Sequence, residues 1–164
     1  MAVSLLTTKL YVPRARADLV SRQRLLARLR GPTALPAVHK LTLISAPAGF
    51  GKTTLLSEWA ATCDHPVAWV SLDEGDNDPI RFWSYVIAAL GSIPALADAE
   101  IGRAVFSRLG AFPLANGQDA ALDESLLAEL INEIAAVPHA GHGHAFSLVL
   151  DDFHLITASE IHRG

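Results

Sequence analysis

The sequence places a lysine and two threonines directly after a glycine-rich bend. In the stretch "ISAPAGFGKTTLLSEW", Gly49 and Gly51 stand on either side of Phe50, and Lys52 follows. Glycines let the backbone curl so that successive N–H groups point at an anion, and a helix that begins there directs its positive end to the same place. The lysine adds a mobile positive charge, and a neighbouring hydroxyl can bind Mg²⁺. These residue types in this order predict a site for phosphate groups.

The spacing fits the P-loop pattern G-x-x-x-x-G-K-[ST], with Ala46 in the place of the first glycine. Lys52 is expected to contact the β- and γ-phosphates of a nucleotide, and Thr53 is expected to bind Mg²⁺. The residues predicted to bind the nucleotide are the bend and the start of the following helix, namely Ala46, Pro47, Ala48, Gly49, Phe50, Gly51, Lys52, Thr53 and Thr54. A plain strand–turn–helix bend would not require Gly-Lys-Thr after its loop.

Two aspartates end the apolar stretch "FSLVLDDF" about a hundred residues later. An acid at the carboxyl end of a neighbouring parallel strand can supply the hard oxygen that Mg²⁺ prefers. We assign Asp151 to that metal role. Asp152 is the candidate catalytic residue because it could polarise an attacking water, although a helix cap or a surface charge would also explain it. The pair indicates a nucleoside triphosphate, and the Asn-Lys-x-Asp and D-x-x-G motifs of GTPases are absent from the sequence.

The elements that must position these residues alternate between strands and helices. Apolar runs predict strands at 41–45, 66–72 and 145–150. Helical spacing predicts helices at 21–31, 52–62, 79–90, about 99–109 and 123–137, with Ser21, Asp78 and Asp123 as N-caps. The polar "DEGDND" stretch between the second strand and its helix is read as a solvated turn or an acidic interaction loop. The predicted class is α/β with a parallel sheet flanked by helices.

Composition fits an ordinary soluble protein. The net charge is −4, no apolar run is long enough to cross a membrane, no secretory signal is present, and Cys63 is the single cysteine, which fits a reducing cytoplasm. Residues 1–52 carry nine Lys or Arg and one acid, whereas residues 53–164 carry four Arg and sixteen acids. The basic part could face a nucleotide, dock against the acidic remainder, or form a solvated helix.

Four stretches together carry a family resemblance: "TKLYVPRARADLVSRQRLLARL", "LTLISAPAGFGKTTLLSEWAA", "VAWVSLDEGDNDPIRFWSYVIAAL" and "LVLDDFHLIT". In content and order they resemble the N-terminal ATPase module of the MalT-like transcription activators of the LuxR type. These belong to the STAND class of P-loop ATPases. The resemblance implies ATP or ADP with Mg²⁺ as cofactors, and it suggests Val20 and Arg22 near the adenine.

The resemblance also implies how the chain is divided into domains. Residues 1–39 would be an arm with a first helix, and residues 40–164 would be a P-loop NTPase domain of the ASCE type that is incomplete after its Walker B strand. We therefore expect a fragment of a weak regulatory ATPase. Its inducer and DNA would be bound by domains outside these residues, and its active form would self-associate. A small-molecule P-loop kinase and a non-hydrolysing nucleotide-binding module are the alternatives.

Overall fold

The computed structural model describes residues 4–14, 20–30, 41–103, 105, 107, 124–137 and 146–163. It divides into two compact units, each of which is described by itself. The smaller unit is Val12–Val67, and the larger unit combines Met1–Tyr11 with Ala68–Gly164. The glycine-rich bend at 46–51 belongs to the smaller unit, and the two aspartates belong to the larger one.

The smaller unit is built on two helices that pack against each other, α1 (Gln23–Arg30) and α2 (Lys52–Ala60). Leu26 of α1 and Leu55 of α2 are buried, as the apolar stripes of both helices predict. The helix α1 begins later than expected, so that Arg22 rather than Ser21 directly precedes it. The backbone N–H groups of Leu25 and Leu26 both donate to the Arg22 carbonyl oxygen, which closes the first turn.

The strand predicted at 41–45 is not formed, and this expectation was wrong. Residues 41–47 have no secondary structure, and Leu41 and Leu43 are 86% and 85% exposed. A strand buried on both faces needs a hydrogen-bonding neighbour and apolar cover. In the described part of the chain, the sheet consists of two other strands, and residues 41–45 pair with neither. An apolar run alone therefore predicted burial that the fold does not supply here.

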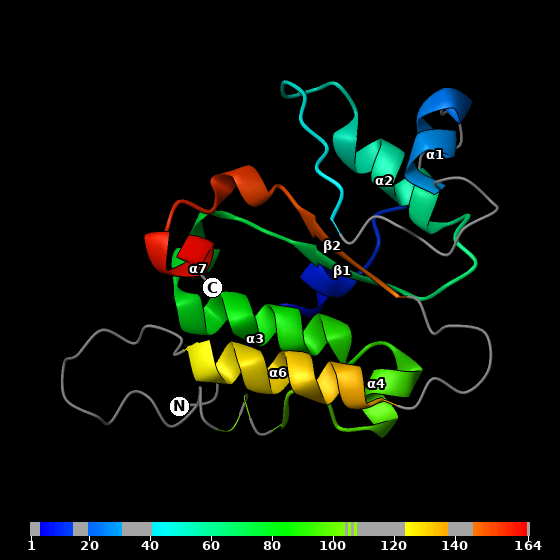
Figure 1. The fold of residues 1–164 in the computed structure, drawn as a ribbon. Coiled ribbons are helices and arrows are strands. Elements are labelled where there is room, and N and C mark those ends of the chain that lie inside the picture. Colours follow the sequence, from blue (N-terminus) through cyan, green and yellow to red (C-terminus); the bar gives the residue numbers. More distant parts are fainter. Residues whose placement is uncertain are drawn as a thin grey trace. The chain divides into compact units, whose positions relative to one another are not determined.

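The larger unit is organised around a small parallel sheet of β1 (Val67–Ser71) and β2 (Ser147–Asp151). Both strands were predicted to within two residues at each end. The backbone N–H of Leu72 donates to the Asp151 carbonyl oxygen at 3.0 Å, which continues the pairing to the carboxyl ends of the strands. The helix α3 (Pro79–Leu90) lies next to the sheet, and α6 (Glu124–Ala136) runs alongside α3 (Figure 1).

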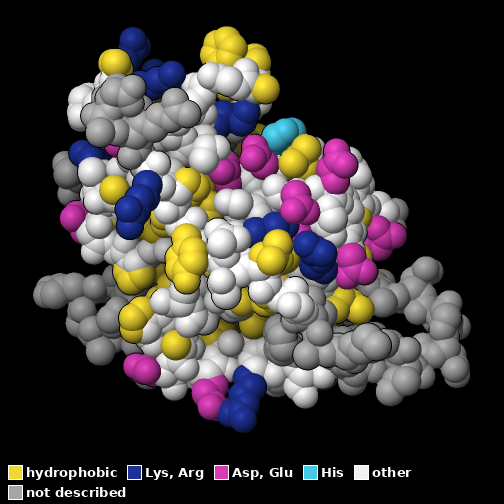
Figure 2. Space-filling model, turned by 180° about the vertical axis from the view of Figure 1, so that it is seen from behind, with side chains coloured by type: hydrophobic (Ala, Val, Ile, Leu, Met, Phe, Trp, Pro, Cys, Tyr) yellow, Lys and Arg dark blue, Asp and Glu magenta, His cyan; other side chains and the backbone are white. Residues whose placement is uncertain are grey.

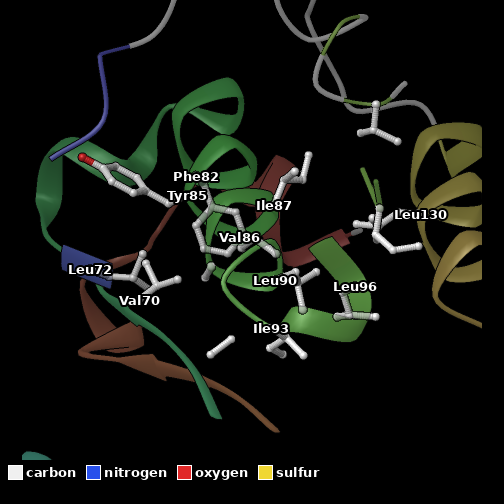
Figure 3. Close-up of a cluster of buried hydrophobic side chains, with 14 of the residues drawn as sticks. Val70, Leu72, Phe82, Tyr85, Val86, Ile87, Leu90, Ile93, Leu96 and Leu130 are labelled. Atoms are coloured by element: carbon white, nitrogen blue, oxygen red, sulfur yellow. The ribbon is translucent and has the colours of Figure 1, made fainter. Parts of the chain in front are cut away.

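The helix α3 contributes more buried side chains to the core of this unit than any other described element. Its buried side chains meet Val70 and Leu72 of the sheet region and Leu130 of α6 (Figure 3). The start of α3 is the one that the sequence predicts, because the Asp78 side chain accepts a hydrogen bond from the Arg81 backbone N–H at 2.8 Å and Pro79 occupies the first turn.

Shorter elements complete the described part. They are the 3-10 turns η1 (Thr7–Leu10), η2 (Glu74–Asn77) and η4 (Phe153–Leu155), and the short helices α4 (Pro94–Asp98) and α7 (Ser159–Arg163). The helix α4 was not predicted. It precedes the helix expected at 99–109, and in that range residues 103, 105 and 107 are helical. The N-cap candidate Asp123 lies outside the described residues. Within them, no helix has the length and apolar character needed to cross a membrane.

Candidate phosphate-binding site

The bend before α2 requires its two glycines for conformational reasons. Gly49 and Gly51 have φ values of 81° and 77°, in the left-handed region that other residues rarely adopt. A Cβ atom at Gly49 would meet nothing within 4 Å, so the need for glycine there is a matter of backbone angle and not of space. Gly51 is the residue before α2. The bend therefore leads directly into a helix N-terminus, as predicted.

The side chain of Lys52 folds back over this bend. Its Nζ atom donates to the carbonyl oxygens of Ala46 at 2.9 Å and Pro47 at 3.4 Å. Both acceptors are neutral, and a phosphate oxygen would be the stronger acceptor for an ammonium group. One turn further along, the Ser57 hydroxyl donates to the Thr53 carbonyl oxygen at 2.8 Å and braces the start of α2. Lys52 is thus held within the bend, where an anion would meet it.

A second cation, Arg22, lies at the same bend. Its Nη1 atom donates to the Phe50 carbonyl oxygen at 2.8 Å, and its guanidinium lies within 3.4 Å of where a Cβ of Gly51 would be. An open pocket of about 360 Å³ adjoins these residues. It is lined by Val20, Arg22, Gly51, Thr54, Leu55 and Glu58. The structure therefore brings Val20 and Arg22 to the helix that carries the P-loop pattern.

The two aspartates differ sharply in environment. Asp151, the last residue of β2, is 5% exposed, whereas the Asp152 side chain is 44% exposed. Asp152 also has a left-handed backbone, with φ 58° and ψ 30°. The His154 Nδ1 atom lies 3.8 Å from its Oδ1 atom. A buried carboxylate at a strand end suits a metal-binding role, and a more exposed neighbour can meet water. The glycine bend with Lys52 is described within the smaller unit, and the two aspartates are described within the larger unit.

The "DEGDND" stretch is a turn with four exposed residues, as one of the two readings expected, but one of its aspartates is not solvated. Asp76 is fully buried, with Arg81 Nε 2.9 Å from its Oδ1 atom and the Asp73 backbone N–H 2.8 Å from its Oδ2 atom. The ammonium group of Lys9, from η1, also binds Oδ2. Asp76 is therefore the centre of an ion-pair junction with Lys9 and Arg81. A single sequence gives no signal for it, because Lys9 and Asp76 are 67 positions apart.

The ion pairs of this junction shift the pKa values of its members. Burial alone would lower the pKa of Lys9, but its hydrogen bonds to Asp73 and Asp76 outweigh burial and raise that pKa above the usual value. The hydrogen bond from Lys9 lowers the pKa of Asp73. The hydrogen bond to Asp76 raises the pKa of Arg81. All three shifts favour the charged forms of Lys9, Asp73 and Arg81.

Comparison with known proteins shows which proteins the sequence resembles. No protein-family model matches the chain. It is 42% identical over 160 residues to the "HTH-type transcriptional regulator MalT" of Cronobacter sakazakii, covering 98% of this chain and 16% of that protein. It is 38% identical over 162 residues to proteins of the same name from two Klebsiella pneumoniae strains, covering 96% of this chain and 15% of theirs. The chain thus spans about a sixth of the length of these relatives, and over nearly all of its own length it is similar to these MalT regulators.

Proposed function

We propose that this chain binds ATP or ADP with Mg²⁺ and is the nucleotide-binding part of a signal-responsive STAND ATPase. One observation carries the proposal. The ammonium group of Lys52 lies inside a bend formed by two left-handed glycines, directly at the N-terminus of α2. Backbone N–H groups, a helix dipole and a lysine then converge on one point, and this combination favours a phosphate.

The residues at this point would divide the nucleotide between them. Lys52 would exchange its backbone acceptors for the β- and γ-phosphates, and Thr54 would lie beside the remaining phosphate. Val20 and Leu55 offer apolar walls of the adjoining pocket to the base, with Arg22 between the base and the bend. Thr53 and Asp151 carry the hydroxyl and carboxylate oxygens that suit Mg²⁺, which would offset the negative charge of the phosphates.

Hydrolysis would be the task of Asp152. Its carboxylate would accept a proton from a water molecule as the water oxygen bonds to the γ-phosphorus. The bond between that phosphorus and the β–γ bridging oxygen then breaks, and ADP leaves with inorganic phosphate. The proton returns from Asp152 to solvent. A partly exposed carboxylate next to a buried one is compatible with this division between water activation and metal binding.

The names of the relatives support a proposed role in transcription regulation. They are named as transcriptional regulators, and this chain matches about a sixth of their length. In our proposal, the nucleotide state switches the whole cytoplasmic protein between a resting form and a self-associating active form. The inducer and DNA would be bound by parts outside these 164 residues. ADP would favour the resting form and ATP the active form.

An equilibrium titration tests the binding proposal. A fluorescent ATP analogue would be added to the full natural chain that carries these residues, and unlabelled ATP, ADP and GTP would compete. We expect ATP and ADP to displace the analogue, and chelation of Mg²⁺ to weaken ATP binding. Absence of saturable binding would contradict the proposal. Binding without any turnover would favour the non-hydrolysing module, and phosphate transfer to an added metabolite would favour a kinase.

A further inference from the structure

The side-chain amide of Asn77 joins two segments that lie far apart in the sequence. Its Nδ2 atom donates to the Leu155 carbonyl oxygen at 2.9 Å. Its Oδ1 atom accepts from the backbone N–H groups of Thr157 at 2.6 Å and Ala158 at 2.9 Å. Nδ2 also donates to the Glu74 carbonyl oxygen at 3.0 Å within its own turn. Both ends of the amide are therefore used, and the loop after β1 is fixed to the segment after β2.

The segment that Asn77 holds begins at Asp152. The Asp152 carbonyl oxygen accepts from the Leu155 N–H at 3.0 Å, which closes the turn η4. The strand β2 fixes one end of this turn, and Asn77 fixes the other. Asp152 is in a left-handed conformation, which residues with a side chain rarely adopt, although aspartate and asparagine tolerate it better than most. The contacts of Asn77 help to hold the turn in which Asp152 adopts this conformation.

Asn77 is itself held on both sides. The residue before it, Asp76, is fully buried in the ion pairs with Lys9 and Arg81. The residue after it, Asp78, caps α3. A positioning group works only if its own place is fixed by packing and hydrogen bonds. Asn77 meets this condition, because a buried ion-pair cluster and a helix start flank it.

We propose that Asn77 is a positioning residue for Asp152, and this inference rests on the proposed hydrolysis. Asn77 fixes the turn that begins at Asp152 and thereby aims its carboxylate at the attacking water. Misplacing a reacting group by about 1 Å can cost about 10²-fold in rate. Asn77→Asp keeps the size of the side chain but directs an oxygen at the Leu155 and Glu74 carbonyl oxygens. We expect this variant to slow ATP turnover by about 10- to 100-fold and to leave ATP affinity unchanged.

The test compares Asn77→Asp, Asp152→Asn and the double variant in the full natural chain, by ATP turnover and by equilibrium ATP binding. If Asn77 acts through Asp152, the double variant is no slower than Asp152→Asn alone. Glu74→Gln is the matched control, because it is an exposed side chain of the same turn and only its backbone contacts Asn77. A second readout needs no nucleotide: the Thr157 and Ala158 amides should exchange hydrogen faster in Asn77→Ala.

The outcomes separate the two proposals. Slow turnover in Asp152→Asn with normal turnover in Asn77→Asp would overturn the positioning role, and so would additive effects in the double variant. Weaker ATP binding in Asn77→Asp, in parallel with slower turnover, would show a general structural role and would overturn it as well. If the wild-type protein binds ATP but does not hydrolyse it, the proposed hydrolysis fails first, and the role of Asn77 falls with it.

Discussion

Lys9 and Asp76 form an ion pair in which both side chains are largely removed from water. The side chain of Lys9 is 10% exposed and that of Asp76 is 0% exposed. The Lys9 ammonium group also lies 4.9 Å from the centre of the Tyr85 ring, and the Leu6 N–H donates to the Tyr85 hydroxyl at 3.1 Å. This hydroxyl points away from the apolar cluster (Figure 3). The turn η1 and the residue before it are thus tied to η2 and to the middle of α3.

This pair predicts a large effect of Asp76 on stability. Asp76→Ala would leave the buried Lys9 ammonium without its buried carboxylate partner and with only the half-exposed Asp73, and removing one member of a buried pair costs about 3–5 kcal/mol of unfolding free energy. Denaturant unfolding of the full natural chain measures it. Glu74→Ala, at an exposed position of the same turn, should change stability by less than about 0.5 kcal/mol. Equal effects of the two changes would show that the ion pair does not stabilise the fold.

The lowered pKa of Asp73 predicts how the interaction of Asp73 with Lys9 contributes to stability at different pH values. A carboxyl with a depressed folded-state pKa stabilises the fold above its ordinary value of 3.8, and this contribution disappears as pH falls through the lowered value. Wild type should therefore exceed Asp73→Asn in unfolding free energy near neutral pH, and the difference should shrink below pH 3.8. Asp98→Asn, at an exposed site on α4, is the control. A difference that stays constant into strong acid would refute the link to Lys9.

The two neighbouring aspartates should separate binding from turnover. Asp152→Asn keeps a residue that tolerates the left-handed backbone, so it should preserve ATP binding and slow hydrolysis by about 10²-fold or more. Asp151→Asn should instead weaken ATP binding in the presence of Mg²⁺ and have little effect once Mg²⁺ is chelated. Turnover and binding assays on both variants test the assignment. Equal effects of both changes on binding would mean that the division of roles is wrong.

We expect these 164 residues not to bind DNA specifically. The sequence shows no recognition-helix pair with a glycine turn, and its net charge is −4. On the face shown in Figure 2, Lys and Arg side chains lie in several small groups, with acidic, apolar and polar side chains between these groups. Weak attraction to any polyanion should fade as salt rises. A competition gel shift at about 0.15 M salt is the test. A retained shift that only one promoter sequence competes away would contradict this expectation.

The sequence predicted best those parts of the molecule that depend on local rules. The Asp78–Pro79 start of α3 and the glycine bend before α2 came out as expected, because caps and left-handed glycines act within a few residues. The prediction of a strand at 41–45 was wrong because strand formation depends on a pairing partner that is distant in the sequence, and an apolar run cannot reveal that partner. The roles of Lys9 and Asn77 were missed for the same reason, since their contacts lie 67 and 78 or more positions away.

The most direct test of nucleotide binding is the affinity of Lys52→Ala for ATP. In the described part of the structure, the Lys52 ammonium group donates to two backbone carbonyl oxygens of the bend, so its loss should remove a charged phosphate contact while the fold persists. A hydrogen bond to a charged group contributes about 1.5–3 kcal/mol, which corresponds to roughly 10- to 100-fold weaker binding. Arg24→Ala, which removes an exposed cation of α1, should leave the affinity unchanged. Equilibrium binding of a labelled ATP analogue to wild type and both variants decides the matter, and unchanged affinity in Lys52→Ala would contradict the assignment of the bend as a phosphate site.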